Sequence, residues 1–343
     1  MAYAQANLRR REDSVRAVVD SALVRAARLD PVSGRPSYLL AIATLLPAVR
    51  KSRGFFHSNN FWHHLSARDN QRFDSLLVES FLREPFIDII LDPVLAPEDL
   101  APPERYRETE DRAYVAYQAG QYEVALRLWS ELLERSPERI DLRWHRAHVL
   151  YWQQQYDLVV AILNEVLARL GPSSDSVEVR VLPATDIVHY AIGIAYERAG
   201  QPDSAAEFYR RTLLDNLGMY MAHMRLSAIL LDRGDTLNAV REISVAADIA
   251  PAEPLVLTQY GAVLVRVGRP ADAIEPLTTV MRINPGYATP YLVLGIAYSD
   301  LHRNPEALAA FERFLEHAAQ LDERRSWVVS RVMELRISGK KGL

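Results

Sequence analysis

The stretch GQPDSAAEFY, residues 200–209, decides the fold because its pattern returns along the chain, and its last four copies are 34 residues apart. A glycine, an alanine five residues after it and a large residue four further on keep the same phase. Across the copies these positions hold Gly120, Gly200, Gly234 and Gly268; Ala125, Ala205, Ala239, Ala273 and Ala307; and Trp129, Tyr209, Ile243, Leu277 and Phe311. A step of this length predicts a stack of similar units, each too small to bury its own apolar faces.

A second series of small residues lies twelve positions before the alanines. It consists of Ala113, Ala147, Gly193, Ser227, Gly261 and Gly295. With this series, the pattern resembles the tetratricopeptide repeat family. The resemblance implies pairs of antiparallel helices. We therefore expect an all-α protein: a right-handed α-solenoid of about six helix pairs with a C-terminal capping helix, preceded by an N-terminal helical domain.

The phase of the pattern also predicts where each unit begins and ends. The repeats are expected at 106–139, 140–173, 186–219, 220–253, 254–287 and 288–321, with an insertion at 174–185 and a cap and tail at 322–343. The second repeat departs most, with Gln154 in the glycine position and Val159 in the alanine position, and the sixth has His302 in the glycine position.

Each position that recurs in the repeat pattern has an expected physical role. The alanine and the small residue should lie where the two helices approach most closely, and the large residue should fill the gap to the neighbouring repeat. The glycine should allow the tight turn between helices, because glycine enters left-handed backbone conformations without steric cost.

The two ends lack the repeat. Residues 1–105 are expected to form a mostly helical domain, with helices at 13–29, 36–50 and 70–83, packed on the first repeat or laid in its groove. A connector at 85–105 contains five prolines and a short apolar piece at 86–91. At the other end, Trp327, Val328, Val332 and Leu335 share one helical stripe, which predicts the capping helix.

The composition limits which compartments and which classes of partner are expected. The 343 residues are 49% hydrophobic and 24% charged, include no cysteine and carry a net charge of −4, so disulfides, thiolate metal sites and a broad nucleic-acid surface are not expected. The longest apolar stretch, 38–49, is about 18 Å as a helix, too short for direct membrane insertion. A cytoplasmic bacterial protein is favoured. The small-x-small form of residues 2–4 keeps a periplasmic or exported protein open, if the numbering starts at a processed end.

No catalytic constellation stands out. The sequence has no G-x-S-x-G, P-loop, G-x-G-x-x-G or H-E-x-x-H motif, so we expect no catalytic residue, no metal and no cofactor. Two groups of histidines are candidate metal ligands: His57, His63 and His64 near Asp69, and the pair His145 and His148 on one predicted helix face. Neither has the converging ligands that a metal needs.

The resemblance implies that the first helix of each repeat lines a concave groove. The basic residues that clamp chaperone C-terminal carboxylates are missing at these positions, which hold Glu110 and Tyr114 in the first repeat, so a chaperone-tail adaptor is rejected. An aromatic cluster stands there instead, with arginines expected to give polar selectivity. The candidate groove residues are Tyr114, Tyr117, Trp144, His148, Tyr151, Trp152, Tyr190, Arg198, Arg225 and Arg266. Either the N-terminal domain or insertion covers this cluster, or a partner does.

These patterns predict a scaffold or assembly factor that binds a helix or extended peptide of an unidentified protein in the groove. The alternative is a structural subunit of a larger bacterial complex, membrane-associated or exported. An enzyme with a small metal-dependent N-terminal domain is the third reading. The partner and the oligomeric state stay open.

Overall fold

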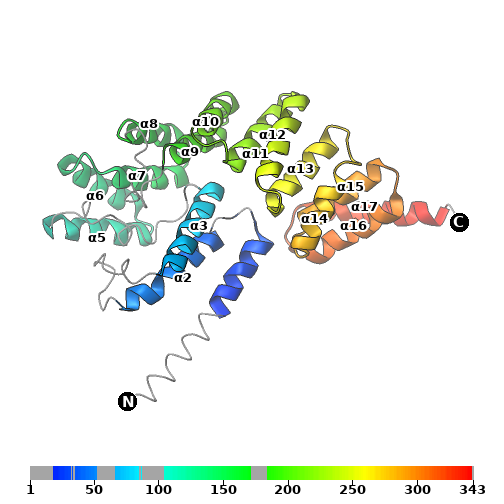
Figure 1. Cartoon of the computed structure of the whole chain (residues 1–343), viewed down its shortest axis with the longest axis horizontal. Coiled ribbons are helices and arrows are strands. Elements are labelled where there is room, and N and C mark those ends of the chain that lie inside the picture. Colours follow the sequence, from blue (N-terminus) through cyan, green and yellow to red (C-terminus); the bar gives the residue numbers. More distant parts are fainter. Residues whose placement is uncertain are drawn as a thin grey trace, which may run out of the picture. The chain divides into compact units, whose positions relative to one another are not determined.

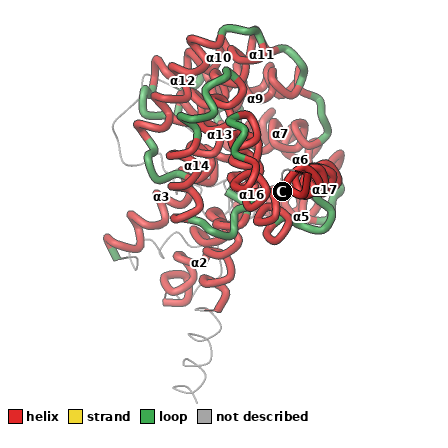
Figure 2. The backbone as a smooth tube through the Cα atoms, turned by 90° about the vertical axis from the view of Figure 1, so that its right-hand side faces the viewer, coloured by secondary structure: helices red, strands yellow, loops and turns green. Residues whose placement is uncertain are grey.

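The computed structural model describes residues 18–31, 33, 35–51, 66–84, 86, 104–170 and 184–341. Within these ranges the regular structure is entirely helical, which confirms the all-α prediction (Figures 1 and 2). None of the described helices combines the length and the apolar character needed to cross a bilayer. Residues 174–183 of the expected insertion, and 1–17, 52–65, 85 and 87–103 of the expected N-terminal domain and connector, lie outside the described residues.

The described residues fall into two compact units. The first takes residues up to 23 and those from 35 to 216; the second takes residues 24–33 and those from 217 onward. The helices of the first unit are α2 (Arg35–Lys51), α3 (Ala67–Arg83), α5 (Glu104–Gln118), α6 (Tyr122–Arg135), α7 (Ile140–Trp152), α8 (Tyr156–Leu167), α9 (Thr185–Arg198) and α10 (Pro202–Asp215). Those of the second are α11 (Tyr220–Asp232), α12 (Thr236–Ile249), α13 (Pro254–Arg266), α14 (Ile274–Ile283), α15 (Thr289–Asp300), α16 (Asn304–His317) and α17 (Arg324–Lys341).

Each first helix packs against the second helix of its own repeat, and the small residue makes room for the large one. A Cβ added at Gly193 would come within 2.5 Å of the Tyr209 ring, and one at Gly261 within 2.5 Å of the Leu277 side chain. Gly295 meets the ring of Phe311 in the same way. The large residue therefore fills space inside its own repeat, in addition to the expected contact with the following helix, which Trp129 makes with His145 and Phe311 makes with Trp327.

Short turns join the helices of each pair, and one residue in each turn is left-handed. Gly120, Gly200, Gly234 and Gly268 have φ between 71° and 79°. Gln154 and His302, the two residues that replace this glycine, take the same conformation, with φ of 61° and 57°. The turn geometry is thus kept in the second and sixth repeats, where side chains adopt it at a steric cost.

The helices before the repeats follow their sequence signals. Helix α2 spans 35–51 and α3 spans 67–83, against expectations of 36–50 and 70–83, and the two contact each other. The earlier start of α3 has a local cause, since the Ser66 hydroxyl caps it by accepting a hydrogen bond from the backbone N–H of Asp69 at 3.1 Å.

Residues 18–29 are also helical, and residues 24–33 belong to the second unit. The side chain of Asn284 donates a hydrogen bond to the backbone carbonyl of Arg28, and the Leu29 side chain lies against Gly286. This part of the N-terminal region therefore packs at the end of the fifth repeat, whereas the sequence suggested the first repeat or the groove.

Helix α17 covers the last repeat by packing on α16. Its stripe of Val328, Val332 and Leu335 is buried, and the ring of Trp327 meets Phe311 edge-on at 5.7 Å. The expected capping helix is confirmed, although Trp327 stays 49% exposed.

The packing of the fourth repeat gives a first prediction. Ala239 is fully buried opposite Ser227, whose hydroxyl donates to its carbonyl at 2.7 Å. We expect Ala239→Leu to lower the free energy of unfolding by more than about 2 kcal/mol through overpacking. The same change at exposed Ala228, on the partner helix, should stay within about 0.5 kcal/mol. Urea denaturation measures both, and equal losses would contradict the packing described.

The left-handed turn gives a second prediction. Gln154→Gly should raise the free energy of unfolding by about 0.5–1 kcal/mol, because relief of the left-handed strain exceeds the entropy that glycine adds to the unfolded chain. Its neighbour Gln153 has φ −79° and ψ 2°, so Gln153→Gly should lower stability instead. Opposite signs in chemical denaturation support the turn geometry; a loss at both positions would refute it.

Candidate functional site

An aromatic cluster joins the first two repeats in the first unit. Two hydrogen bonds link α5 to α7: the Tyr114 hydroxyl meets His145 Nδ1 at 3.0 Å, and the Tyr117 hydroxyl meets His148 Nε2 at 2.9 Å. Both tyrosines and both histidines are three residues apart on their helices, so each pair shares one face. All four side chains are buried, and the two bonds fix the relative register of α5 and α7.

Trp129, the large residue of the first repeat, lies at the centre of this cluster. It reaches in from α6 and is fully buried. Its ring lies 5.8 Å from Tyr114, 6.0 Å from Tyr117 and 5.3 Å from His145. The repeat pattern identified Trp129 as a packing residue but did not connect it with the groove positions, which it supports from behind.

Phe86 occupies the outer part of the cluster, although it precedes the first repeat. It is 2% exposed, and its ring stacks on Tyr151 with centroids 4.1 Å apart and on Trp144 at 5.9 Å, both at an interplanar angle of 12°. Tyr151 and Trp144 are seven residues apart on α7, two turns or about 10.5 Å along one face, a spacing that accommodates a ring between them. Phe86 belongs to the short apolar piece at 86–91, and nothing in the sequence pattern predicts its contact with α7.

Trp152 holds the main chain of Phe86. Its indole Nε1–H donates to the Phe86 carbonyl at 3.0 Å and also lies 3.1 Å from His148 Nε2. Because an indole N–H can only donate, this contact favours His148 with an unprotonated Nε2, to which the Tyr117 hydroxyl then donates. The Phe86 carbonyl is thereby linked through Trp152 and His148 to α5.

The strength of the Phe86 contact is moderate. Full burial of a phenylalanine side chain contributes about 1.5–3 kcal/mol, and one neutral hydrogen bond about 0.5–1.5 kcal/mol. The entropy of ordering the chain around Phe86 opposes these gains. Trp152 is 50% exposed, so one edge of the contact is open to solvent.

The remaining candidate groove residues lie outside this cluster. Tyr190 is fully buried against Tyr209, with ring centroids 5.8 Å apart. Arg198 is exposed at the end of α9. In the second unit, Arg225 on α11 is half-buried, and Arg266 on α13 is 58% exposed in its side chain and pairs with Asp232 at 2.8 Å.

A buried ionic group positions α7. Arg139, which precedes its first residue, donates from Nε to Asp141 at 2.8 Å and from Nη2 to Glu110 on α5 at 2.8 Å. All three side chains are buried. Burial alone would lower the pKa of Arg139, but the hydrogen bond and charge of Asp141 and the charge of Glu110 outweigh it and raise that pKa above its usual value. The arginine therefore stays charged and ties the start of α7 to α5.

The histidines considered as metal ligands have other roles or lie elsewhere. His145 and His148 each bond a tyrosine hydroxyl. His57, His63 and His64 lie outside the described residues, and Asp69 stands in the first turn of α3. Across the part of the chain that the structure describes, no three His, Asp or Glu side chains converge in a way that could hold a metal ion.

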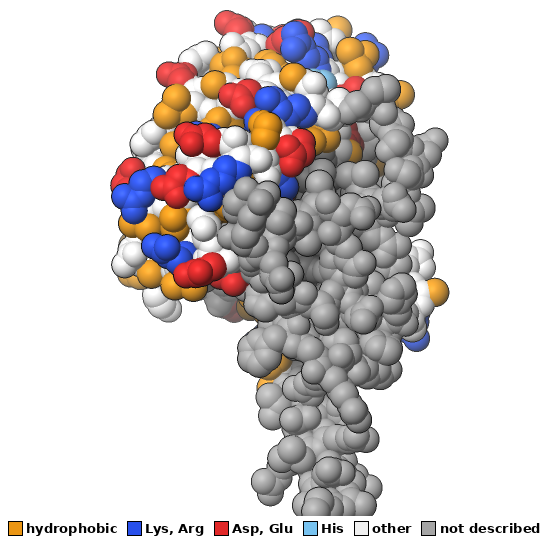
Figure 3. Space-filling model, turned by 90° about the vertical axis from the view of Figure 1, so that its left-hand side faces the viewer, with side chains coloured by type: hydrophobic (Ala, Val, Ile, Leu, Met, Phe, Trp, Pro, Cys, Tyr) orange, Lys and Arg blue, Asp and Glu red, His pale blue; other side chains and the backbone are white. Residues whose placement is uncertain are grey.

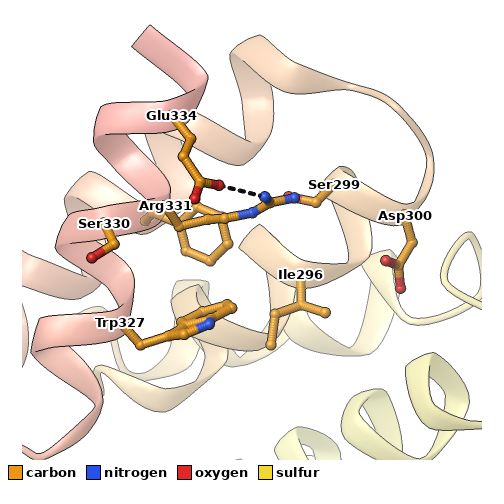
Figure 4. Close-up of a pocket in the computed structure, with 8 residues that line it drawn as sticks. Ile296, Ser299, Asp300, Trp327, Ser330, Arg331 and Glu334 are labelled. Carbon is orange, nitrogen blue, oxygen red and sulfur yellow. Dashed lines mark hydrogen bonds and ion pairs between the residues drawn. The ribbon is translucent and has the colours of Figure 1, made fainter. Parts of the chain in front are cut away.

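A hollow lies between α15, α16 and α17 in the second unit. It has a volume of about 270 Å3, and Figure 4 shows Trp327 and Ile296 near each other among the lining residues, with the Arg331–Glu334 ion pair of 2.7 Å beside them. These two charged side chains come from one helix and satisfy each other. The hollow is therefore an open seam beside the cap, with nothing that points to a reaction.

The surface charge is mixed. Figure 3 draws one face of the molecule and shows acidic and basic side chains next to one another over its described part. Because the two signs are interspersed, the described part of this face has no extended positive surface that could attract nucleic acid.

Comparison with known proteins agrees with the geometry. The tetratricopeptide repeat family model matches residues 110–175 and 190–254. Among solved structures, the C-terminal part of a TPR repeat-containing protein from Cytophaga hutchinsonii is 14% identical over 62% of this chain and 78% of its own, with a TM-score of 0.50. YrrB, a TPR protein with an unusual peptide-binding site, is 16% identical over 59% of this chain and 97% of its own, with a TM-score of 0.45. MamA is 19% identical over 50% and 93%, with a TM-score of 0.43. No curated protein sequence gives a significant match.

The ionic group gives a third prediction. Arg139→Met should lower the free energy of unfolding by about 3–5 kcal/mol, because it leaves Glu110 and Asp141 buried without their cation. Arg313→Met, which removes an exposed pair with Glu316, should cost at most about 1 kcal/mol. Chemical denaturation of both variants provides the comparison. A small effect at Arg139 would mean that α7 is not held by this group.

Proposed function

From the tetratricopeptide repeats at 110–175 and 190–254 we infer that the chain is a protein-interaction scaffold whose first-helix surface binds a segment of a partner protein. This repeat fold is a protein-interaction fold. The finer statement, that a helix or extended peptide of the partner lies on the groove residues of α5, α7 and α9, is our proposal.

One observation carries it. The outer surface of α7 already holds a piece of polypeptide, since Tyr151 stacks on the Phe86 ring and Trp152 bonds the Phe86 carbonyl. A surface that recognises a side chain and a main-chain carbonyl together has the chemistry of peptide binding. Half-exposed tryptophan and tyrosine are also the residue types that dominate binding energy at protein interfaces.

The arginines supply the polar part of the proposal. Arg198 in the first unit and Arg266 in the second are exposed, and each stands at the end of a first helix. The Arg266–Asp232 pair is exposed on both sides, so it gains little stability and can exchange Asp232 for a carboxylate of a partner. Guanidinium groups in such places favour acidic or carbonyl-rich partner segments.

The fourth prediction tests the groove with two matched tryptophans. Trp152 and Trp327 are 50% and 49% exposed, but only Trp152 lies on a first helix of the repeats. We expect Trp152→Ala to weaken binding of the partner proteins captured by the full chain by tenfold or more, on the order of an interface hot spot. Quantitative affinity capture at several chain concentrations measures the change.

Trp327→Ala should leave the same partners bound. If both variants keep every partner at wild-type affinity, the groove proposal is wrong, and contacts through the other surfaces of the chain, as in a structural subunit, explain the binding.

A further inference from the structure

We propose that the Phe86 contact is a recognition slot for one aromatic residue of a peptide segment, and that Phe86 is a resident ligand that a partner segment displaces. This inference rests on the proposed function and names the chemistry of the partner. The slot consists of the Trp144 and Tyr151 rings and the Trp152 indole N–H.

The slot binds two groups of a single residue, its aromatic ring and its main-chain carbonyl. The Phe86 ring lies nearly parallel to both Trp144 and Tyr151, and the carbonyl of the same residue accepts the Trp152 hydrogen bond. Parallel walls select a planar side chain, since a branched aliphatic side chain cannot stack on two ring faces. Any aromatic residue carries both groups, a ring and a main-chain carbonyl, and the stacking and the hydrogen bond that hold Phe86 in the slot use only these two.

Phe86 is also placed so that it can leave. It lies three residues beyond the last residue of α3, so its release need not unwind that helix. The half-exposed Trp152 borders the slot, so a competing segment can reach the hydrogen-bond donor from solvent. The Tyr117–His148 hydrogen bond lies behind Trp152 and would hold the donor side of the slot in place when Phe86 is absent.

Occupation by Phe86 has a measurable consequence. A peptide that needs the slot binds with an affinity reduced by the fraction of molecules in which the slot is empty. Emptying the slot by substitution should therefore strengthen binding of such a peptide, which is the opposite of what the loss of a partner contact would do.

The test uses the chain's own sequence as the probe, a fluorescent peptide LREPFID covering residues 82–88. By fluorescence anisotropy we expect the full-length Phe86→Ala chain to bind this peptide at least about tenfold more tightly than the wild-type chain. The peptide LREPAID, which lacks the ring, should bind neither. Helical content measured by circular dichroism checks that the variant is folded.

Three further variants isolate the role of the N–H and guard against misfolding. Adding Trp152→Phe to Phe86→Ala keeps a ring but removes the N–H, so peptide affinity should fall by about three- to tenfold. Adding Trp327→Phe instead should change nothing. If Phe86→Ala does not fold, Phe86→Leu keeps most of the bulk but cannot stack, and it should still bind the peptide several-fold more tightly than the wild type.

The outcomes separate this inference from the proposed function. A folded Phe86→Ala chain that ignores the peptide, or binds LREPAID equally well, overturns the slot even if Trp152→Ala weakens partner capture. Peptide binding with unchanged partner capture overturns the proposed function and leaves the slot. Self-association of the wild-type chain that Phe86→Ala abolishes would put a second copy in the slot and overturn the foreign peptide.

Discussion

The structure depends on one steric contact that recurs in its repeats: a large side chain of the second helix fits over a small residue of the first. Tyr209 over Gly193, Leu277 over Gly261 and Phe311 over Gly295 are variants of it, and even a methyl group on the small side would collide with the large one. This contact lets the two helix backbones come close and fixes their offset. The neighbouring helices then follow, because each pair presents a defined face to the next.

The sequence predicted this part of the molecule well because every contribution to it is local or recurs in phase. The left-handed turn at Gln154 and His302 follows from the register alone, even though neither is glycine. Only part of the packing of the large residue was predicted, namely the contact with the following helix that Trp129 and Phe311 make, because phase tells which residues are equivalent and not which neighbours they touch. The Phe86 contact was out of reach for another reason: it joins residues 66 positions apart, and Phe86 belongs to no repeat.

The candidate groove shows how burial divides residues that look alike in sequence. Tyr114, Tyr117 and Trp144 were grouped with Trp152 as aromatic first-helix residues, yet the first three are buried and Trp152 is half exposed. A buried tyrosine needs a partner for its hydroxyl, and His145 and His148 provide it, which explains two histidines that fit no metal site. The aromatic residues of this region therefore have two roles. Most of them form the buried contact between the first two repeats, and Trp152 at the edge of the cluster binds Phe86.

The bond between Asn284 and the Arg28 carbonyl spans 256 residues of sequence and lies within the second unit. At about 5–20 residues per second, a ribosome needs roughly 13–51 s to make the chain between the two positions. For that time residues 24–33 have left the ribosome without their docking site, while the helix pairs between them can form one after another. The second unit is thus completed by a segment that was synthesised well before the rest of that unit, and a polypeptide terminated before residue 284 can build most of its repeats but never that contact.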